Sequence, residues 1–97
     1  MIAKVSEITV EDLKSYLRIS DDLSDDDKKF LQTILNSSIN YIKNSTGVDD
    51  IDKYSDLVIV VFVLCQDMYD NRTLYVDKNN VNKVVSSILG QHDNNLL

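Results

Sequence analysis

Apolar side chains recur along this chain with helical spacing, and the clearest example is the segment 25–46. One half of its helical wheel carries the large apolar residues and the other half is polar, as in an amphipathic helix. The first half holds Phe30, Leu31, Ile34, Leu35, Ser38, Ile39, Tyr41 and Ile42. Ser24 precedes the segment as an N-cap, and Gly47 follows it as a residue that ends helices. The pattern therefore predicts one helix over 25–46, about 30 Å long.

Two shorter segments show the same spacing. The N-cap residue Thr9 and two acids in the following turn predict a helix over 10–18. Its apolar face holds Val10, Leu13, Tyr16 and Leu17. Near the other end, Asn79 or Asn80 as the N-cap and Gly90 as the stop predict a helix over 80–90. Its stripe holds Val81, Val84, Val85, Ile88 and Leu89.

The segment 53–70 is ambiguous between a helix and a strand. Its run of β-branched residues favours a strand, whereas its length and its lack of turn residues favour a helix. We predict a helix, followed by a short extended piece over 73–76. The wheel of residues 57–65 has no polar side, so such a helix must be covered all round. Three short neighbours would leave part of it uncovered, which is a hint that another subunit packs there.

The acidic stretch 21–27 could be read as a calcium loop or as a helix start. The calcium pattern requires Gly at its sixth position and Glu at its twelfth. Those positions hold Asp26 and Gln32, so the pattern fails. We interpret Asp25, Asp26 and Asp27 as the first turn of the helix that Ser24 caps, where the helix dipole favours negative charge.

Composition narrows the class of protein. The chain has 97 residues, enough for one small domain. We expect an all-α domain over 1–97, a small bundle of four helices with mobile ends at 1–8 and 91–97. Lys and Arg number 10 against 16 Asp and Glu, and this net charge of -6 argues against wrapping nucleic acid. One Cys and one His exclude an internal disulfide and a Cys/His zinc site.

Nothing in the pattern predicts catalysis. His92 lies in a polar tail without a partner nucleophile, and Cys65 lies inside the apolar segment. The two glycines are too far apart for a phosphate loop. We therefore expect no enzyme activity, no metal and no cofactor.

The chain also lacks the signals of secretion and membrane insertion. Its longest apolar run, Leu57–Cys65, has nine residues against the roughly 20 that cross a bilayer. Residues 1–5 lack the apolar core of a signal peptide. We expect a soluble, intracellular protein with no membrane partner.

The order of the segments resembles the tailed-phage head–tail connector family, small adaptor proteins also found in prophages. The resemblance covers roughly residues 8–90 and rests on four pieces in order. They are Thr9-Val10-Glu11-Asp12-Leu13-Lys14-Ser15-Tyr16-Leu17-Arg18-Ile19, the acidic gap, the long segment running from Phe30-Leu31 to Tyr41-Ile42-Lys43-Asn44-Ser45-Thr46-Gly47, and the apolar segment ending in Met68-Tyr69-Asp70-Asn71-Arg72.

This resemblance implies a structural protein that assembles as a ring under the portal, extends the DNA channel and allows tail attachment. Its implied partners are the portal protein, a tail-side adaptor or stopper protein, and further copies of itself. DNA would pass through without specific binding, which suits an acidic chain. The implied locations are the host cytoplasm during assembly and the head–tail junction of the virion.

Two segments are our candidates for contacts with these partners. In the loop 71–79, Arg72, Tyr75 and Lys78 could reach a neighbouring copy or the portal. In the tail 91–97, Leu96 and Leu97 could insert into a partner groove. An alternative function is that of a small acidic regulatory or inhibitor domain that binds a basic partner protein through charge steering.

Overall fold

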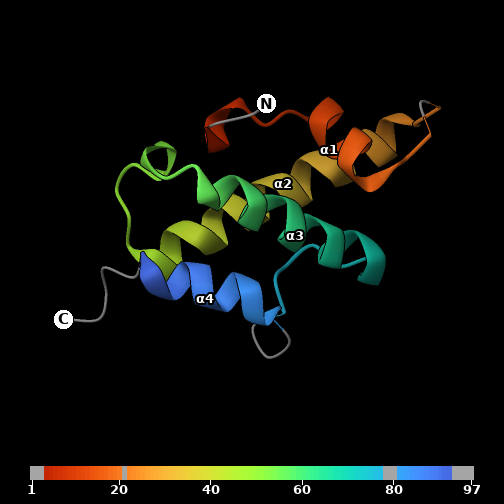
Figure 1. The fold of residues 1–97 in the computed structure, drawn as a ribbon. Helices are drawn as coiled ribbons and strands as arrows, with labels where there is room; N and C mark the ends of the chain where they lie inside the picture. Colours follow the sequence, from red (N-terminus) through yellow and green to blue (C-terminus); the bar gives the residue numbers. More distant parts are fainter. Residues whose placement is uncertain (1–3, 21, 78–80, 93–97) are drawn as a thin grey trace.

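The computed structural model describes residues 4–20, 22–77 and 81–92, and it confirms the all-α prediction (Figure 1). These residues form four α-helices and two short 3-10 turns, η1 and η2, and none of them forms a strand. The elements are η1 (Val5–Glu7), α1 (Val10–Leu17), α2 (Asp25–Thr46), η2 (Ile51–Lys53), α3 (Asp56–Asn71) and α4 (Lys83–Gln91).

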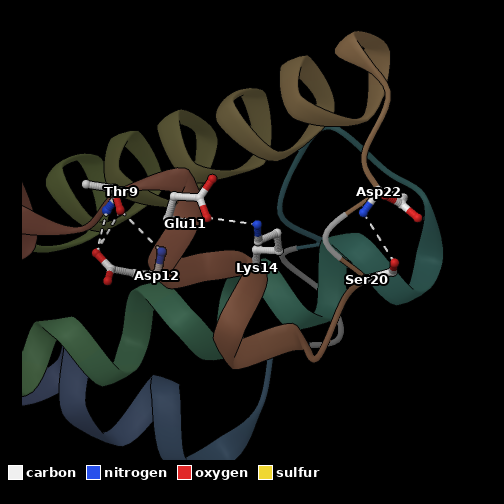
Figure 2. Close-up of polar contacts among 6 residues, drawn as sticks. All are labelled: Thr9, Glu11, Asp12, Lys14, Ser20 and Asp22. Carbon is white, nitrogen blue, oxygen red and sulfur yellow. Dashed lines mark hydrogen bonds and ion pairs between the residues drawn. The ribbon is translucent and has the colours of Figure 1, made fainter.

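The starts of α1 and α2 confirm the predicted caps. The Thr9 hydroxyl accepts from the Asp12 backbone N–H at 3.2 Å, and the Asp12 carboxylate accepts from the Thr9 N–H at 2.9 Å (Figure 2). Ser24 and Asp27 make the same reciprocal pair at 3.1 and 3.4 Å. Each pair satisfies backbone donors that a helix start leaves open. Asp25, Asp26 and Asp27 therefore form the first turn of α2, as we predicted.

Further polar contacts shape α1 and the loop after it. On the surface of α1, Lys14 forms an ion pair with Glu11 at 2.8 Å (Figure 2). In the loop that follows, the Asp22 backbone N–H donates to the Ser20 hydroxyl at 3.3 Å (Figure 2). The chain therefore turns from α1 into α2 through short-range bonds.

The long α2 and the apolar α3 form the centre of the bundle. In Figure 1, α3 crosses in front of α2, with η1 and α1 along one of its flanks and α4 along the other. Every helix contributes to one apolar core, whose fully buried side chains include Leu13, Leu31, Ile34, Ile42, Leu57, Leu64, Met68 and Val85. At α2's end, Gly47 takes the left-handed conformation (φ 67°) that a helix stop favours.

The segment that we could also read as a strand is the helix α3. Seven of its apolar side chains are buried, because α1, α2, α4 and η1 all pack against it. The other elements of the same chain thus bury most of the apolar surface of α3, for which the sequence alone did not predict enough covering partners. Ile59 is the exception, with 57% of its surface exposed, and Phe62 and Val63 are half-buried.

Three details differ from the sequence expectations. The cap of α4 is Asn82, whose side chain accepts from the Val84 N–H at 2.8 Å, while Asn79 and Asn80 lie outside the described residues. Gly90 lies inside α4, which ends at Gln91. Leu74 and Tyr75 form a bend, and none of residues 73–76 is in a strand. No described strand lies beside them as a partner, and the carbonyl of Leu74 accepts from the hydroxyl of Ser37 instead.

Both ends are packed where the structure describes them. Val5 is buried in the core, and Ser6 donates two hydrogen bonds to Asp52, one from its backbone N–H at 2.9 Å and one from its hydroxyl at 2.6 Å. These bonds join η1 to η2. Val5 and Ser6 are therefore tied to the rest of the fold, while residues 1–3 lie outside the described residues. None of the described helices is long and apolar enough to cross a membrane.

Candidate interaction surfaces

Arg72 caps the C-terminal end of α3 in an unusual backbone conformation. Its φ is 54°, in the left-handed region that non-glycine residues visit rarely and at a cost of roughly 1–2 kcal/mol. Its guanidinium carbon lies 4.6 Å from the centre of the Tyr69 ring and 5.5 Å from that of Phe30. It forms no ion pair with a carboxylate of the described residues. Arg72 is thus an exposed cation within cation–π distance of two aromatic rings.

A small cavity of about 170 Å³ lies beside this cation. Its lining is mostly apolar, with one acid and one base: Ile19, Leu23, Asp27, Phe30, Leu31, Tyr69 and Arg72. The loop between α1 and α2 closes one side of the cavity, and the end of α3 closes the other. A hollow of this composition can take an apolar side chain next to a charged group.

Leu74 and Tyr75 form the exposed tip of the loop after α3. They are 52% and 68% exposed, which is unusual for two adjacent large apolar side chains. The Ser37 hydroxyl of α2 donates to the Leu74 carbonyl at 2.8 Å and fixes the loop against that helix. Tyr75 lines a shallow hollow of about 250 Å³ over α2 and a deeper one of about 370 Å³ towards α3.

The deeper hollow is acidic. Asp67 and Asp77 both line it, together with Asn71 and Thr73. Burial, and then the neighbouring charge of Asp70, raise the pKa of Asp67 above its ordinary value. This side of the loop therefore favours cationic or hydrogen-bonding groups over anions.

A second exposed apolar surface lies on α3 and α1. The rings of Tyr16 and Phe62 stack with centroids 4.8 Å apart, and Tyr16 is 46% exposed. Ile59 and Val63 continue this surface along α3. The sequence led us to expect that part of this helix would stay uncovered, because its wheel has no polar side, but it did not indicate which residues these would be or that Tyr16 of α1 would join them.

His92 also has a role that the sequence did not indicate. Its Nε2 lies 2.8 and 3.0 Å from the two carboxylate oxygens of Asp56, and its ring lies 4.2 Å from that of Tyr54. Only 15% of its side chain is exposed. We expected a residue of a mobile tail, but these contacts dock the end of α4 onto the start of α3. No sequence pattern marks such a pair, because its members are far apart in the chain.

Of the five predicted contact residues, the structure describes Arg72 and Tyr75. Both residues are exposed, but they border different hollows. Arg72 lines the cavity beside Phe30, and Tyr75 lines the two hollows over α2 and towards α3. Lys78, Leu96 and Leu97 lie outside the described residues. The structure thus places two of the predicted residues in one loop but not in a common site.

The buried polar groups have structural contacts. Cys65 is fully buried, its thiol donates towards the Ser38 hydroxyl at 3.5 Å, and burial raises its pKa to about 11. A thiol in this state is not a nucleophile near neutral pH. Within the described ranges, no three His, Cys, Asp or Glu side chains converge as metal ligands would.

The structure is that of a small all-α protein whose most distinctive surface features are its exposed apolar groups and a cation held over two aromatic rings. A family model described as phage gp6-like head-tail connector protein matches residues 7–93. The chain belongs to this family, which is structural rather than enzymatic and acts at the head–tail junction of phage. No curated protein and no solved structure shows a comparable match.

Proposed function

We propose that this protein assembles as a ring under the portal, extends the DNA channel and prepares the head for tail attachment, without catalysis. The observation that carries the proposal is the family match over residues 7–93. A ring requires two different patches on each subunit, because head-to-tail contacts are heterologous. The exposed loop tip at Leu74 and Tyr75 and the apolar surface at Tyr16 and Ile59 supply two such patches.

Charge supports passage of DNA rather than its capture. The net charge is -6, and the first turn of α2 alone carries three aspartates. DNA that must slide through a channel is retarded by clustered Lys and Arg, since each phosphate contact adds affinity. An acidic subunit avoids such contacts. We therefore propose that DNA passes without specific binding, and that the partners are the portal and a tail-side adaptor or stopper protein.

The contact residues belong to the same proposal. Arg72, Tyr75 and Lys78 would reach a neighbouring copy or the portal, and Leu96 and Leu97 would insert into a partner groove. The exposure of Arg72 and Tyr75 supports the first group. Arg72 is supported further because its guanidinium forms no ion pair with the described carboxylates. Such a cation is suited to a carboxylate of another chain.

Native mass spectrometry with the portal protein of the same phage tests the proposal. We expect a complex in which several copies of this chain bind one portal assembly. In the infected cell this complex would form in the host cytoplasm before the tail is joined. Failure to bind that portal or to form a ring on it would overturn the proposal. Salt-sensitive binding to a single basic protein without any ring would instead support the acidic regulatory domain.

The predicted contacts of Leu96 and Leu97 can be tested by deleting part of the tail. Deletion of all of 91–97 would remove His92 as well and so undock α4. Truncation after His92 is therefore the sharper test of the tail, and Leu96→Ala with Leu97→Ala is its milder form. We expect head–tail joining to fall in both variants while the helix content, measured by circular dichroism, is kept. Normal joining in both would show that the two leucines make no required contact.

A further inference from the structure

The hollow between Arg72 and the loop that joins α1 to α2, called here the Arg72 cavity, has the size and lining of a pocket for one apolar side chain. Its volume is about 170 Å³, and five of its seven lining residues are aliphatic or aromatic. In other proteins an apolar cavity of about 150 Å³ holds a benzene-sized molecule. The Arg72 cavity is therefore large enough for a single leucine side chain.

The guanidinium at the wall of this cavity has hydrogen-bond donors to offer. Arg72 contacts the rings of Tyr69 and Phe30, but none of its N–H groups is bonded to an acceptor of the described residues. Its φ is 54°, whereas α2 ends in the same left-handed region with Gly47, which adopts it without steric cost. The end of α3 thus carries a strained arginine where glycine would be unstrained, which is typical of a residue whose side chain has a binding role.

The lining of the Arg72 cavity suits an uncharged segment. It holds one acid, Asp27, and one base, Arg72, so a neutral occupant leaves no unbalanced charge buried there. The Asp27 carboxylate already accepts from the Ser24 backbone N–H at 3.4 Å. Carbonyl and amide oxygens of an occupant can accept from the guanidinium. The cavity therefore fits an apolar side chain that is preceded by such oxygens.

The segment 94–97 of this chain has that composition. Its sequence is Asn94-Asn95-Leu96-Leu97, with amide and backbone oxygens before two leucines and without a charged side chain. The segment follows His92, which is docked on Asp56 at the start of α3. The two leucines are thus only four and five residues from an anchored point of the bundle.

This short distance keeps the segment from the Arg72 cavity of its own copy. Tyr69 and Arg72 line the cavity at the far end of α3, 13 and 16 residues beyond Asp56. At about 1.5 Å per residue, they lie about 20 and 24 Å along the helix from the point where His92 is docked. Five extended residues span at most about 18 Å. In addition, α4 lies on the flank of α3 opposite to α1 and its loop, which lengthens the path (Figure 1).

We propose that the segment 94–97 of one copy docks in the Arg72 cavity of the next copy. One leucine fills the cavity, and Arg72 donates hydrogen bonds to carbonyl oxygens of the same segment. The inference rests on the proposed ring, and it names both sides of one subunit contact. Each copy gives its segment to one neighbour and receives that of the other, and such a heterologous contact is the kind that closes a ring.

Directed disulfide exchange between two variants tests this contact. Leu97→Cys is activated as a mixed disulfide with thionitrobenzoate, mixed with an equal amount of reduced Leu23→Cys, and assembled on the portal. We expect a disulfide between the two variants, with release of thionitrobenzoate, while the natural Cys65 stays silent because it is fully buried. The matched control replaces Leu23→Cys by Val84→Cys, at a 60% exposed site outside the cavity. The control should react at least about tenfold more slowly, because no contact raises its local concentration.

The other outcomes separate this inference from the proposed function. Rings on the portal with equal reaction rates at Leu23→Cys and Val84→Cys would overturn the inference and leave the ring intact. A single chain that carries both Leu23→Cys and Leu97→Cys should stay unlinked at low concentration without the portal. An internal disulfide in that chain would overturn the assignment to a neighbouring copy. No ring with the unsubstituted chain would overturn the proposed function itself, before any cysteine is introduced.

A second measurement does not depend on disulfide geometry. Arg72→Gly removes the guanidinium and also relieves the left-handed backbone, so the chain should stay folded in circular dichroism. Arg18→Gly is the matched control, because Arg18 ends α1 with φ 56° but does not line the cavity. We expect ring assembly to weaken by at least about tenfold in Arg72→Gly, the effect of losing one charged hydrogen bond, and to stay normal in Arg18→Gly. Equal assembly of both variants would refute the contact.

Discussion

The orientation of α3 decides which of its apolar side chains are buried, and a pair of truncations in that helix tests this orientation. Leu64 is 2% exposed and Ile59 is 57% exposed, although only five residues separate them. Leu64→Ala removes three buried carbons, worth about 2.4 kcal/mol at about 0.8 kcal/mol each. The cavity left behind adds a further term, and measured changes of this kind span roughly 2–5 kcal/mol. We expect the free energy of unfolding to fall by about 3 kcal/mol.

Ile59→Ala serves as the matched control for this truncation. The side chain already contacts water, and Ala has a better helix propensity than Ile. The expected change is within about 0.5 kcal/mol. A loss of 3 kcal/mol corresponds to a lowering of the melting temperature by about 12–24 °C in a domain of this size. The melting temperature of Leu64→Ala should therefore lie far below that of Ile59→Ala.

Urea unfolding followed by far-ultraviolet circular dichroism measures both changes at low protein concentration. The midpoint should shift strongly for Leu64→Ala and hardly for Ile59→Ala, with the slope unchanged in each. Equal losses in the two variants would show that Ile59 is buried in the monomer. A loss below about 1 kcal/mol for Leu64→Ala would show that α3 is turned the other way.

Three further predictions follow from single groups. Gly47→Ala should destabilise the fold by about 1 kcal/mol, because φ is 67° at this position. Gly90→Ala should stabilise the fold by about 0.5 kcal/mol, because an added Cβ meets nothing within 4 Å and Ala favours a helix over Gly. Thermal unfolding measures both changes, and a loss of stability in both variants would contradict the assigned end of α4. Hydrogen bonds from the Ser6 hydroxyl and then from the Ser6 backbone N–H lower the pKa of Asp52. The ionised carboxylate therefore stabilises the folded state above the ordinary carboxyl pKa, and this stabilisation is lost as pH falls through the lowered pKa. Asp52→Asn should therefore flatten the acid side of the stability–pH curve, and an unchanged curve would refute the bond. The thiol of Cys65, with a pKa raised to about 11 by burial, should react with a thiol reagent at pH 8 only after the chain is unfolded, and fast labelling of the native protein would contradict its burial.

The sequence by itself determined the helices, because their signals are local. Ser24 and Gly47 mark the two ends of α2 through short-range hydrogen bonds and backbone conformation, and both ends lie where the pattern placed them. The choice between helix and strand at α3 was also correct on length and turn residues. The family could be inferred from the order of these same segments, and the match over 7–93 shows it.

Only the tertiary structure decided which apolar residues stay exposed. The sequence of α3 has no polar side, so periodicity cannot tell Ile59 from Leu64, and the packing of α1, α2 and α4 makes the distinction. The pairing of His92 with Asp56 across the bundle and the docking of Leu74 on Ser37 have the same origin. Local propensity acts within one turn of the chain, whereas a surface is what remains after distant segments have covered one another.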